Sequence, residues 1–414
     1  MAVLVLGTLA AWFRLPASAR NAMWGEDAAI FSDRALHPEL APYGPLTAYD
    51  GYTHLLPQLL ADFLWRVAPA EYMAQAFTAA ACLVAGAVAV GIFLLTARWN
   101  LNLLGRILLA SLTVLTPGLS FEVLGNLANL HWFLLWLTPF LYFFRPRRWW
   151  SAIVAGCVAY IATATEVQSL LFAPLLLWRI RDRRRWPMIG GAALGTLGQA
   201  FALAGGSRER GDGVALLDTV FGYFLQVPLA GLTGTGQAAS AMVAYSGWIA
   251  AFIAILPFVL CAIWFAWGSW RRMAVVVIFG MSSAVIWSAG FIINYAPTYA
   301  WRSEGAQDLI DGVPLLRYAA IPTMFLFGIV ALAIGRARRS ALGARGIALG
   351  VAVVCLAVLA VGYRVPIAGL RAQGPDWTAG YQNAEIACEE GAASVAIPAA
   401  PSGWEVSSSC DVLP

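Results

Sequence analysis

The chain has 414 residues, of which 60% are hydrophobic and only 12% are charged. A soluble globular protein carries about 25% charged residues, so this composition excludes an ordinary soluble domain. The formal net charge is +4, and all 26 basic residues are arginine. Apolar runs of about 18 residues or more recur along the chain, and each is long enough to cross a bilayer. We therefore expect an all-α polytopic membrane protein.

The apolar runs predict about eleven membrane helices. The expected helices cover residues 1–18, 71–97, 101–117, 131–144, 149–164, 168–180, 187–204, 246–268, 273–293, 316–335 and 346–363. Residues 1–363 then form the membrane domain, and residues 364–414 form a small extracytoplasmic tail. In this tail we expect Asp376 to cap a short helix through Ala387 that Gly391 ends, and residues 394–397 and 404–406 to form short strands. The first run has neither a basic n-region nor a small-residue cleavage site before Arg14, so we expect a helix there and not a cleaved signal peptide.

Arginine predicts the orientation of these helices. It gathers in short connections such as RPRRWW (145–150) and RDRRRW (181–186), which the positive-inside rule places in the cytoplasm. The long connections 19–70, 118–130, 205–245 and 294–316 and the tail then lie outside. Of the 22 carboxylates only Asp182 falls inside. The sequence thus predicts a multi-pass protein of the bacterial inner membrane with an acidic outer face; ordinary solvated loops are the alternative explanation for that acidity.

The segment WGEDAAIFSDRALHPELAPYGPLTAYDGYTHLLPQ, residues 24–58, concentrates polar and aromatic residues in the first outer loop. Its adjacent acids, Glu26 and Asp27, could serve as proton acceptors or metal ligands, or merely as the charges that open a short interfacial helix. A histidine that caps an interfacial helix is the alternative to a sugar-binding role for His54. The candidates for sugar or acceptor binding in this loop are Tyr49, Asp50, Tyr52 and His54.

Further polar residues lie near the ends of the predicted helices. Glu122, Asn126 and Asn129 have the spacing of one helical face, with His131 opposite if the helix is unbroken. A structural hydrogen-bond network between helices is the alternative role for this set. Glu166 lies in a tight turn, where an unsatisfied carboxylate costs about 2.5–3.5 kcal/mol, so we expect it to face a cavity or to pair with an arginine.

Two arginines and two cysteines complete the candidates. Arg317, with Arg302 as second choice, lies near the outer end of a predicted helix, where a guanidinium fork can hold a lipid phosphate. Snorkelling to the interface is the alternative. Cys388 and Cys410 lie in the tail, and two cysteines in an extracytoplasmic segment predict one disulfide.

The sequence contains no P-loop, no glycine-rich dinucleotide motif and no soluble cytoplasmic domain. This argues against a nucleotide-driven pump, and no nucleic-acid partner is expected. No Cys/His metal spacing occurs, so no cofactor is predicted, and a divalent metal has no motif to support it.

The layout resembles the GT-C superfamily of integral membrane glycosyltransferases. The resemblance lies in WGED after the first helix, YDGYTHLLPQLL, GNLANLHW, the Arg317-Tyr318 pair and the outer tail. It implies transfer of a sugar from a polyprenyl-phosphate donor to a hydroxyl of a cell-envelope glycan or glycolipid, with inversion, as in actinobacterial members.

The superfamily uses an acid of the first outer loop as catalytic base. This role carries over to Asp27, with Glu26 as second choice. A later arginine that holds the donor phosphate corresponds to Arg317. The rival class is a flippase or transporter of lipid-linked saccharides, which would be expected to carry ionisable residues in mid-helix and an inverted repeat.

Overall fold

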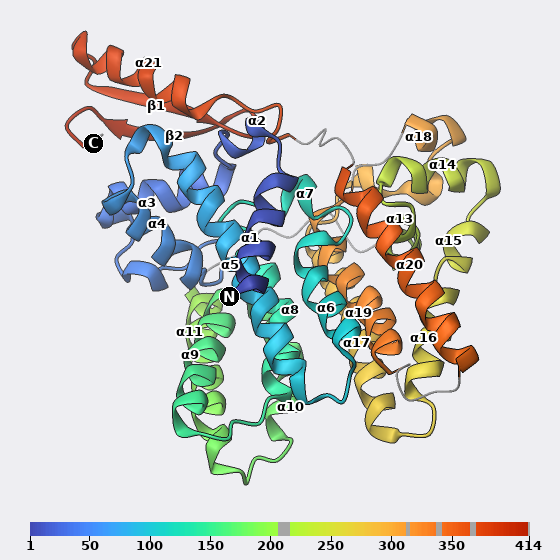
Figure 1. The fold of residues 1–414 in the computed structure, drawn as a ribbon. Coiled ribbons are helices and arrows are strands. Elements are labelled where there is room, and N and C mark those ends of the chain that lie inside the picture. The colour runs from blue at the N-terminus through green and yellow to red at the C-terminus, as the bar shows by residue number, and fades with distance from the viewer. Residues whose placement is uncertain (206–215, 312–314, 337–341, 365–369, 413–414) are drawn as a thin grey trace. The chain divides into compact units, whose positions relative to one another are not determined.

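The computed structural model describes residues 1–205, 216–311, 315–336, 342–364 and 370–412 (Figure 1). The described residues are mostly helical. Their contacts divide the chain into two compact units. The first unit comprises Met1–Ala87, Ser120–Arg208 and Ile367–Pro414, and the second comprises Val88–Leu119 and Glu209–Pro366. These units are defined by contacts between residues, so they do not test the predicted boundary between a membrane domain and a tail at residues 363 and 364. That boundary stays a prediction.

The first unit begins with the N-terminal helix and the first loop, and it ends with the tail. Its elements are α1 (Ala2–Arg14), α2 (Ala17–Arg20), η1 (Asp27–Ser32), α3 (Asp33–Leu36), η2 (Pro38–Leu40), η3 (Gly44–Leu46), α4 (Leu55–Val67), η4 (Ala70–Tyr72), α5 (Met73–Leu95, which continues into the second unit), α8 (Leu130–Phe143), α9 (Trp149–Thr165), η6 (Val167–Phe172), α10 (Pro174–Leu177), η7 (Arg183–Arg185), α11 (Trp186–Gly205), α21 (Trp377–Glu389), β1 (Ser394–Ala399) and β2 (Trp404–Ser409).

Helices α9 and α11 pack closely because glycines line their contact. A Cβ on Gly191 would collide with the carbonyl group of Gly156, and a Cβ on Gly195 would collide with the hydroxyl of Thr163. Small residues let two helix backbones approach in this way. The close packing holds the end of α9, where Thr163 and Glu166 lie, against its neighbour.

The tail folds back on the first loop. Asp376 caps α21 by accepting a hydrogen bond from the backbone of Ala379, as its type and position predict. Strands β1 and β2 pair antiparallel, and a disulfide joins Cys388 to Cys410 with Cα atoms 5.5 Å apart. The Trp404 ring covers Gly25 so closely that a Cβ there would collide with it. The tail thus forms one wall around the WGED segment.

The second unit is a helical bundle. Its elements are η5 (Thr96–Arg98), α6 (Leu103–Leu115), α7 (Leu119–Glu122, shared with the first unit), α12 (Leu216–Phe224), η8 (Leu225–Leu229), α13 (Ala230–Thr233), α14 (Gly236–Ser246), α15 (Ile249–Ile253), α16 (Leu256–Ala266), α17 (Trp270–Ile293), η9 (Pro297–Tyr299), η10 (Trp301–Ser303), α18 (Ala306–Asp311), η11 (Arg317–Ala319), α19 (Ala320–Arg336) and α20 (Leu342–Arg364). Helix α19 lies at its centre against α6, α16 and α17, and nearly every residue of α19 is buried.

Six helices of the described residues are long and apolar enough to cross a membrane, namely 70–98, 183–204, 216–233, 249–266, 270–293 and 317–336. Shorter apolar helices accompany them, including α1, α6, α8 and α9. These helices support an all-α polytopic membrane protein. The count of about eleven, the bacterial inner membrane and the orientation stay predictions.

One predicted outer loop, 205–245, contains one of these helices. Residues 216–233 form a continuous helix of 18 residues, which the sequence analysis assigned to the loop. The buried acid Asp218 and the internal Pro228 interrupt the apolar pattern there. Both are accommodated inside the bundle, because Asp218 pairs with Arg302 and Pro228 lies in the wider turn of η8.

Candidate functional site

Asp27 opens η1 and is only 1% exposed. Its two carboxylate oxygens accept hydrogen bonds from the backbone N–H groups of Leu127 (2.9 Å) and Ala128 (2.8 Å). These residues belong to the turn 123–129, which precedes α8. The Ser32 hydroxyl closes η1 by donating to the Asp27 carbonyl oxygen at 2.7 Å. Asp27 therefore connects the first loop to a turn about one hundred residues later in the chain.

Arg371 interacts with this carboxylate, although no motif of the sequence marks it. It is 4% exposed and donates to the carbonyl oxygens of Ala22 (3.0 Å) and Gly125 (2.6 Å) and to the Thr78 hydroxyl (2.6 Å). Gly125 has a φ of +82°, a conformation that favours glycine. We call Asp27, Arg371 and the turn 123–129 the Asp27 centre.

Burial dominates the electrostatics of the Asp27 centre. It raises the pKa of Asp27 from 3.8 to about 7, against the opposing effects of the N–H donors and the Arg371 charge. Burial likewise lowers the pKa of Arg371 to about 10. A carboxyl group with a pKa near 7 can take up and release a proton at neutral pH, which is what a general base requires.

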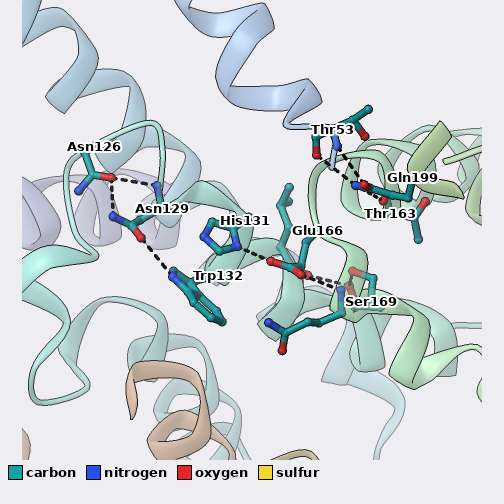
Figure 2. A network of polar contacts seen from close by, with 12 residues as sticks. Thr53, Asn126, Asn129, His131, Trp132, Thr163, Glu166, Ser169 and Gln199 are labelled. Carbon is teal, nitrogen blue, oxygen red and sulfur yellow. Dashed lines mark hydrogen bonds and ion pairs between the residues drawn. The ribbon is translucent and has the colours of Figure 1, made fainter. Parts of the chain in front are cut away.

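A second polar group forms where α8 begins and α9 ends. Nδ1 of His131 contacts the carboxylate of Glu166, and the other oxygen of Glu166 accepts a hydrogen bond from the backbone of Gln168 at 2.7 Å (Figure 2). The side chains are 13% and 3% exposed. Glu166 thus pairs with a histidine and not, as the sequence analysis allowed, with an arginine. A neutral imidazole that donates from Nδ1 presents Nε2 as a proton acceptor.

An aromatic cluster of the first loop borders this His131–Glu166 pair through the His54 ring. The His54 ring lies 5.4 Å from the His131 ring, 4.4 Å from Tyr52 and 6.0 Å from Tyr49, between ring centroids. Thr53 anchors the loop, because its hydroxyl donates to the Ala164 carbonyl oxygen at 2.6 Å and its N–H donates to Gln199 at 3.0 Å. The structure therefore brings together three of the four predicted sugar-binding residues of this loop.

Asp50, the fourth, is exposed and has a φ of +52° in the turn between Tyr49 and Tyr52. That turn is closed by hydrogen bonds between the backbones of Tyr49 and Tyr52, at 2.8 and 3.1 Å. Glu26 precedes η1 and is partly exposed. Of the adjacent acids, only Asp27 is thus enclosed.

The predicted helical stripe of Glu122, Asn126 and Asn129 is wrong in its geometry. Helix α7 ends at Glu122 and a turn follows, so the three residues do not share a helix face. Both asparagine side chains donate to the Glu122 carbonyl oxygen. Asn129 also donates to Asn126 at 2.9 Å, and Trp132 donates to Asn129 at 3.1 Å (Figure 2). The helix breaks because these amides satisfy the backbone of the turn, in which Gly125 has a positive φ.

The predicted phosphate-binding arginines belong to the second unit. Arg302 lies 3.5 Å from the Asp218 carboxylate, which also accepts a hydrogen bond from Tyr295 at 3.3 Å. Arg317 starts η11, and its guanidinium lies 5.6 Å from the ring centroid of Tyr318. A small hollow beside η11 is lined by Pro117, Gly118, Gln226, Ala230, Gly231, Leu315, Leu316, Ala319, Ala320 and Thr323.

Among the described residues, no group of three or more His, Cys, Asp or Glu side chains is placed to hold a metal ion. Comparison with protein-family models finds no match to this chain, and comparison with curated proteins finds none. The resemblance to the GT-C superfamily therefore stays an expectation from the sequence.

Proposed function

We propose that this protein is a membrane glycosyltransferase. It moves a sugar from a polyprenyl-phosphate donor to a hydroxyl of a cell-envelope glycan or glycolipid on the extracytoplasmic side. The observation that carries the proposal is the enclosed Asp27 carboxyl, whose pKa of about 7 suits a proton acceptor. The cluster of Tyr49, Tyr52 and His54 in the same unit supports a sugar ligand, because aromatic rings combine a large apolar face with a polar group at the edge.

The chemistry requires few groups. The acceptor oxygen forms a bond to the anomeric carbon while the bond from that carbon to the phosphate oxygen breaks. The phosphate leaves on its lipid, and the acceptor proton passes to Asp27. Direct displacement inverts the anomeric carbon. A guanidinium fork matches a leaving phosphate. Arg317, with Arg302 as second choice, stays the expectation from the sequence for this role. Base catalysis contributes about 10²–10⁴-fold in such a step.

The test is transfer of radiolabelled sugar from a polyprenyl-phosphate donor by the purified full chain in detergent. Asp27→Asn keeps the shape of the side chain but cannot accept the proton. We expect it to lower transfer by about 10²–10⁴-fold while donor binding and the elution profile stay as in the wild type. Glu26→Gln is the matched control, and it should cost less than tenfold.

Two results would contradict this proposal. If Asp27→Asn transfers sugar as fast as an active wild type, Asp27 is not the base. If the wild type moves lipid-linked saccharide across a vesicle membrane without transferring sugar, the protein is a flippase.

A further inference from the structure

One end of the first unit carries a dense basic surface. It is formed by the connections 144–148 and 178–186, which lead into α9 and α11. Within these connections Asp182 is the single carboxylate. Their exposed arginines are Arg145, Arg147, Arg148, Arg179, Arg181, Arg183 and Arg184. We call this set the arginine surface.

The arginine surface lies far from the His131–Glu166 pair. Glu166 follows the last residue of α9, whereas the arginine surface borders its first residue, Trp149. At about 1.5 Å per residue, a helix of 17 residues separates its two ends by about 25 Å. If α9 crosses the bilayer, the arginine surface and the His131–Glu166 pair lie on opposite sides.

Exposed tryptophans place the arginine surface at the level of lipid headgroups. Trp149, Trp150, Trp178 and Trp186 flank the arginines and are 55%, 63%, 44% and 56% exposed. Tryptophan gathers at the boundary between headgroups and hydrocarbon, because its ring is apolar and its N–H is polar. The helices that follow turn exposed Ile153 and Leu194 outward, as a lipid-facing surface does.

The arginine surface is also held in place by its own hydrogen bonds. Arg185 is fully buried and donates to the carbonyl oxygens of Tyr142 (2.7 Å) and Leu175 (3.2 Å), which ties the connection 178–186 to α8 and α10. Arg145 pairs with Asp182 at 3.2 Å across the two connections. Orienting a membrane protein requires positive charge alone. Arg185 fixes the connection 178–186, and the Arg145–Asp182 pair joins it to the connection 144–148. Such order goes beyond what orientation requires and is what a binding site needs.

We infer that the arginine surface binds the headgroups of anionic phospholipids. The guanidinium fork matches a phosphate through two parallel hydrogen bonds, and several forks on two tied loops can engage a lipid with two phosphates, such as cardiolipin. The neighbouring tryptophans and apolar helix faces select a lipid over a soluble polyanion, because they contact glycerol and acyl chains. This inference does not depend on the proposed glycosyl transfer.

Native mass spectrometry of the purified full chain tests the inference, with cardiolipin or phosphatidylcholine added at equal concentration. We expect the wild type to retain cardiolipin over phosphatidylcholine, and the triple variant Arg147→Ala, Arg148→Ala, Arg183→Ala to retain about fivefold less cardiolipin. A matched control removes three exposed arginines elsewhere, Arg66→Ala, Arg98→Ala, Arg271→Ala. It has the same net charge as the test variant and should retain cardiolipin as the wild type does.

A second variant changes the same three arginines to lysine, which keeps the charge. It replaces the alanine variant in the test if that variant does not fold. The lysine variant should restore cardiolipin retention only partly, because lysine lacks the planar fork. Equal loss of cardiolipin in the control and test variants would overturn the inference. So would displacement of the lipid by 10-fold molar excess of inorganic phosphate or by RNA, because either would assign the arginine surface to a soluble anion.

Discussion

The Asp27 centre and the His131–Glu166 pair both belong to the first unit, and each contains a carboxylate. The two carboxylates have different surroundings. Asp27 is 1% exposed, and both its carboxylate oxygens accept hydrogen bonds from backbone N–H groups. The His131 side chain is 13% exposed and borders the His54 ring of the first loop. The first arrangement tunes a pKa and fixes a turn. The second leaves part of the His131 side chain accessible. The two groups thus differ in how strongly they are enclosed, and the predictions below test what each contributes.

The largest effect on stability should follow from Arg371→Met. Methionine has a similar length but cannot donate, so the carbonyl groups of Ala22 and Gly125 lose their partner inside the protein. We expect a loss of about 3–5 kcal/mol, read as a lower thermal unfolding temperature in detergent. The exposed Arg66→Met is the matched control and should leave that temperature within the error of the wild type. An unchanged unfolding temperature in Arg371→Met would show that the Asp27 centre does not depend on this arginine.

Loss of the disulfide should lower the stability somewhat less than Arg371→Met does. Cys388 and Cys410 are separated by 22 positions, and closing a loop of this size stabilises the tail by about 3 kcal/mol on the loop-entropy model. The tail also carries Trp404, which covers Gly25, so Cys388→Ser should increase protease cleavage of the tail and loosen the wall around Asp27. Mass spectrometry of protein from an oxidising compartment should find the two thiols joined. Two free thiols would contradict the prediction.

His131→Asn separates ligand binding from proton transfer. If His131 contacts the acceptor and Asp27 takes the proton, the variant should raise the KM for the acceptor and lower kcat by less than about tenfold. Gln168→Ala is the control. It removes a side chain next to Glu166 but keeps the backbone N–H of residue 168 that donates to the Glu166 carboxylate. A fall in kcat of two orders of magnitude with KM unchanged would assign the base to the histidine instead.

The smallest expected effect is a shift in the pH dependence of sugar transfer. Because a base must be deprotonated, transfer by the wild type should rise with pH and reach half its maximum near the Asp27 pKa of about 7. The neighbouring charge of Glu26 raises that pKa. Glu26→Gln removes the charge and should therefore move the half-maximum to lower pH, by less than one unit because it is the weakest of the named causes. A shift to higher pH would have the wrong sign for this arrangement.

Stability should depend on pH in the opposite direction. Asp27 has a higher pKa in the folded chain than its ordinary value of 3.8, so the folded state binds more protons between about pH 4 and 7. The contribution of this group to stability is therefore greatest at low pH and is lost as the pH rises toward 7. Comparing unfolding temperatures of the wild type and Asp27→Asn across this range isolates the contribution, because asparagine does not titrate.

Local features of the sequence were sufficient to predict the helical membrane protein and the main elements of the tail. Run length, the Asp376 cap and the strand patterns near Ser394 and Trp404 depend on residues close together in the chain, so they could be read before any packing was known. The count of apolar residues missed the helix 216–233, because Asp218 and Pro228 interrupt its apolar run. Both residues are buried in the bundle, and the sequence alone does not show that.

Only the tertiary structure decided which polar residues meet. His131 and Glu166 lie 35 residues apart, and Arg371 reaches Gly125 across 246 residues. Such contacts depend on the path of the chain, here on a turn at 123–129 in place of a continuous helix. Residue type alone predicted that Glu166 needed a partner, since a carboxylate at this depth is costly without one. It could not name the histidine, because the choice among distant partners is made by packing.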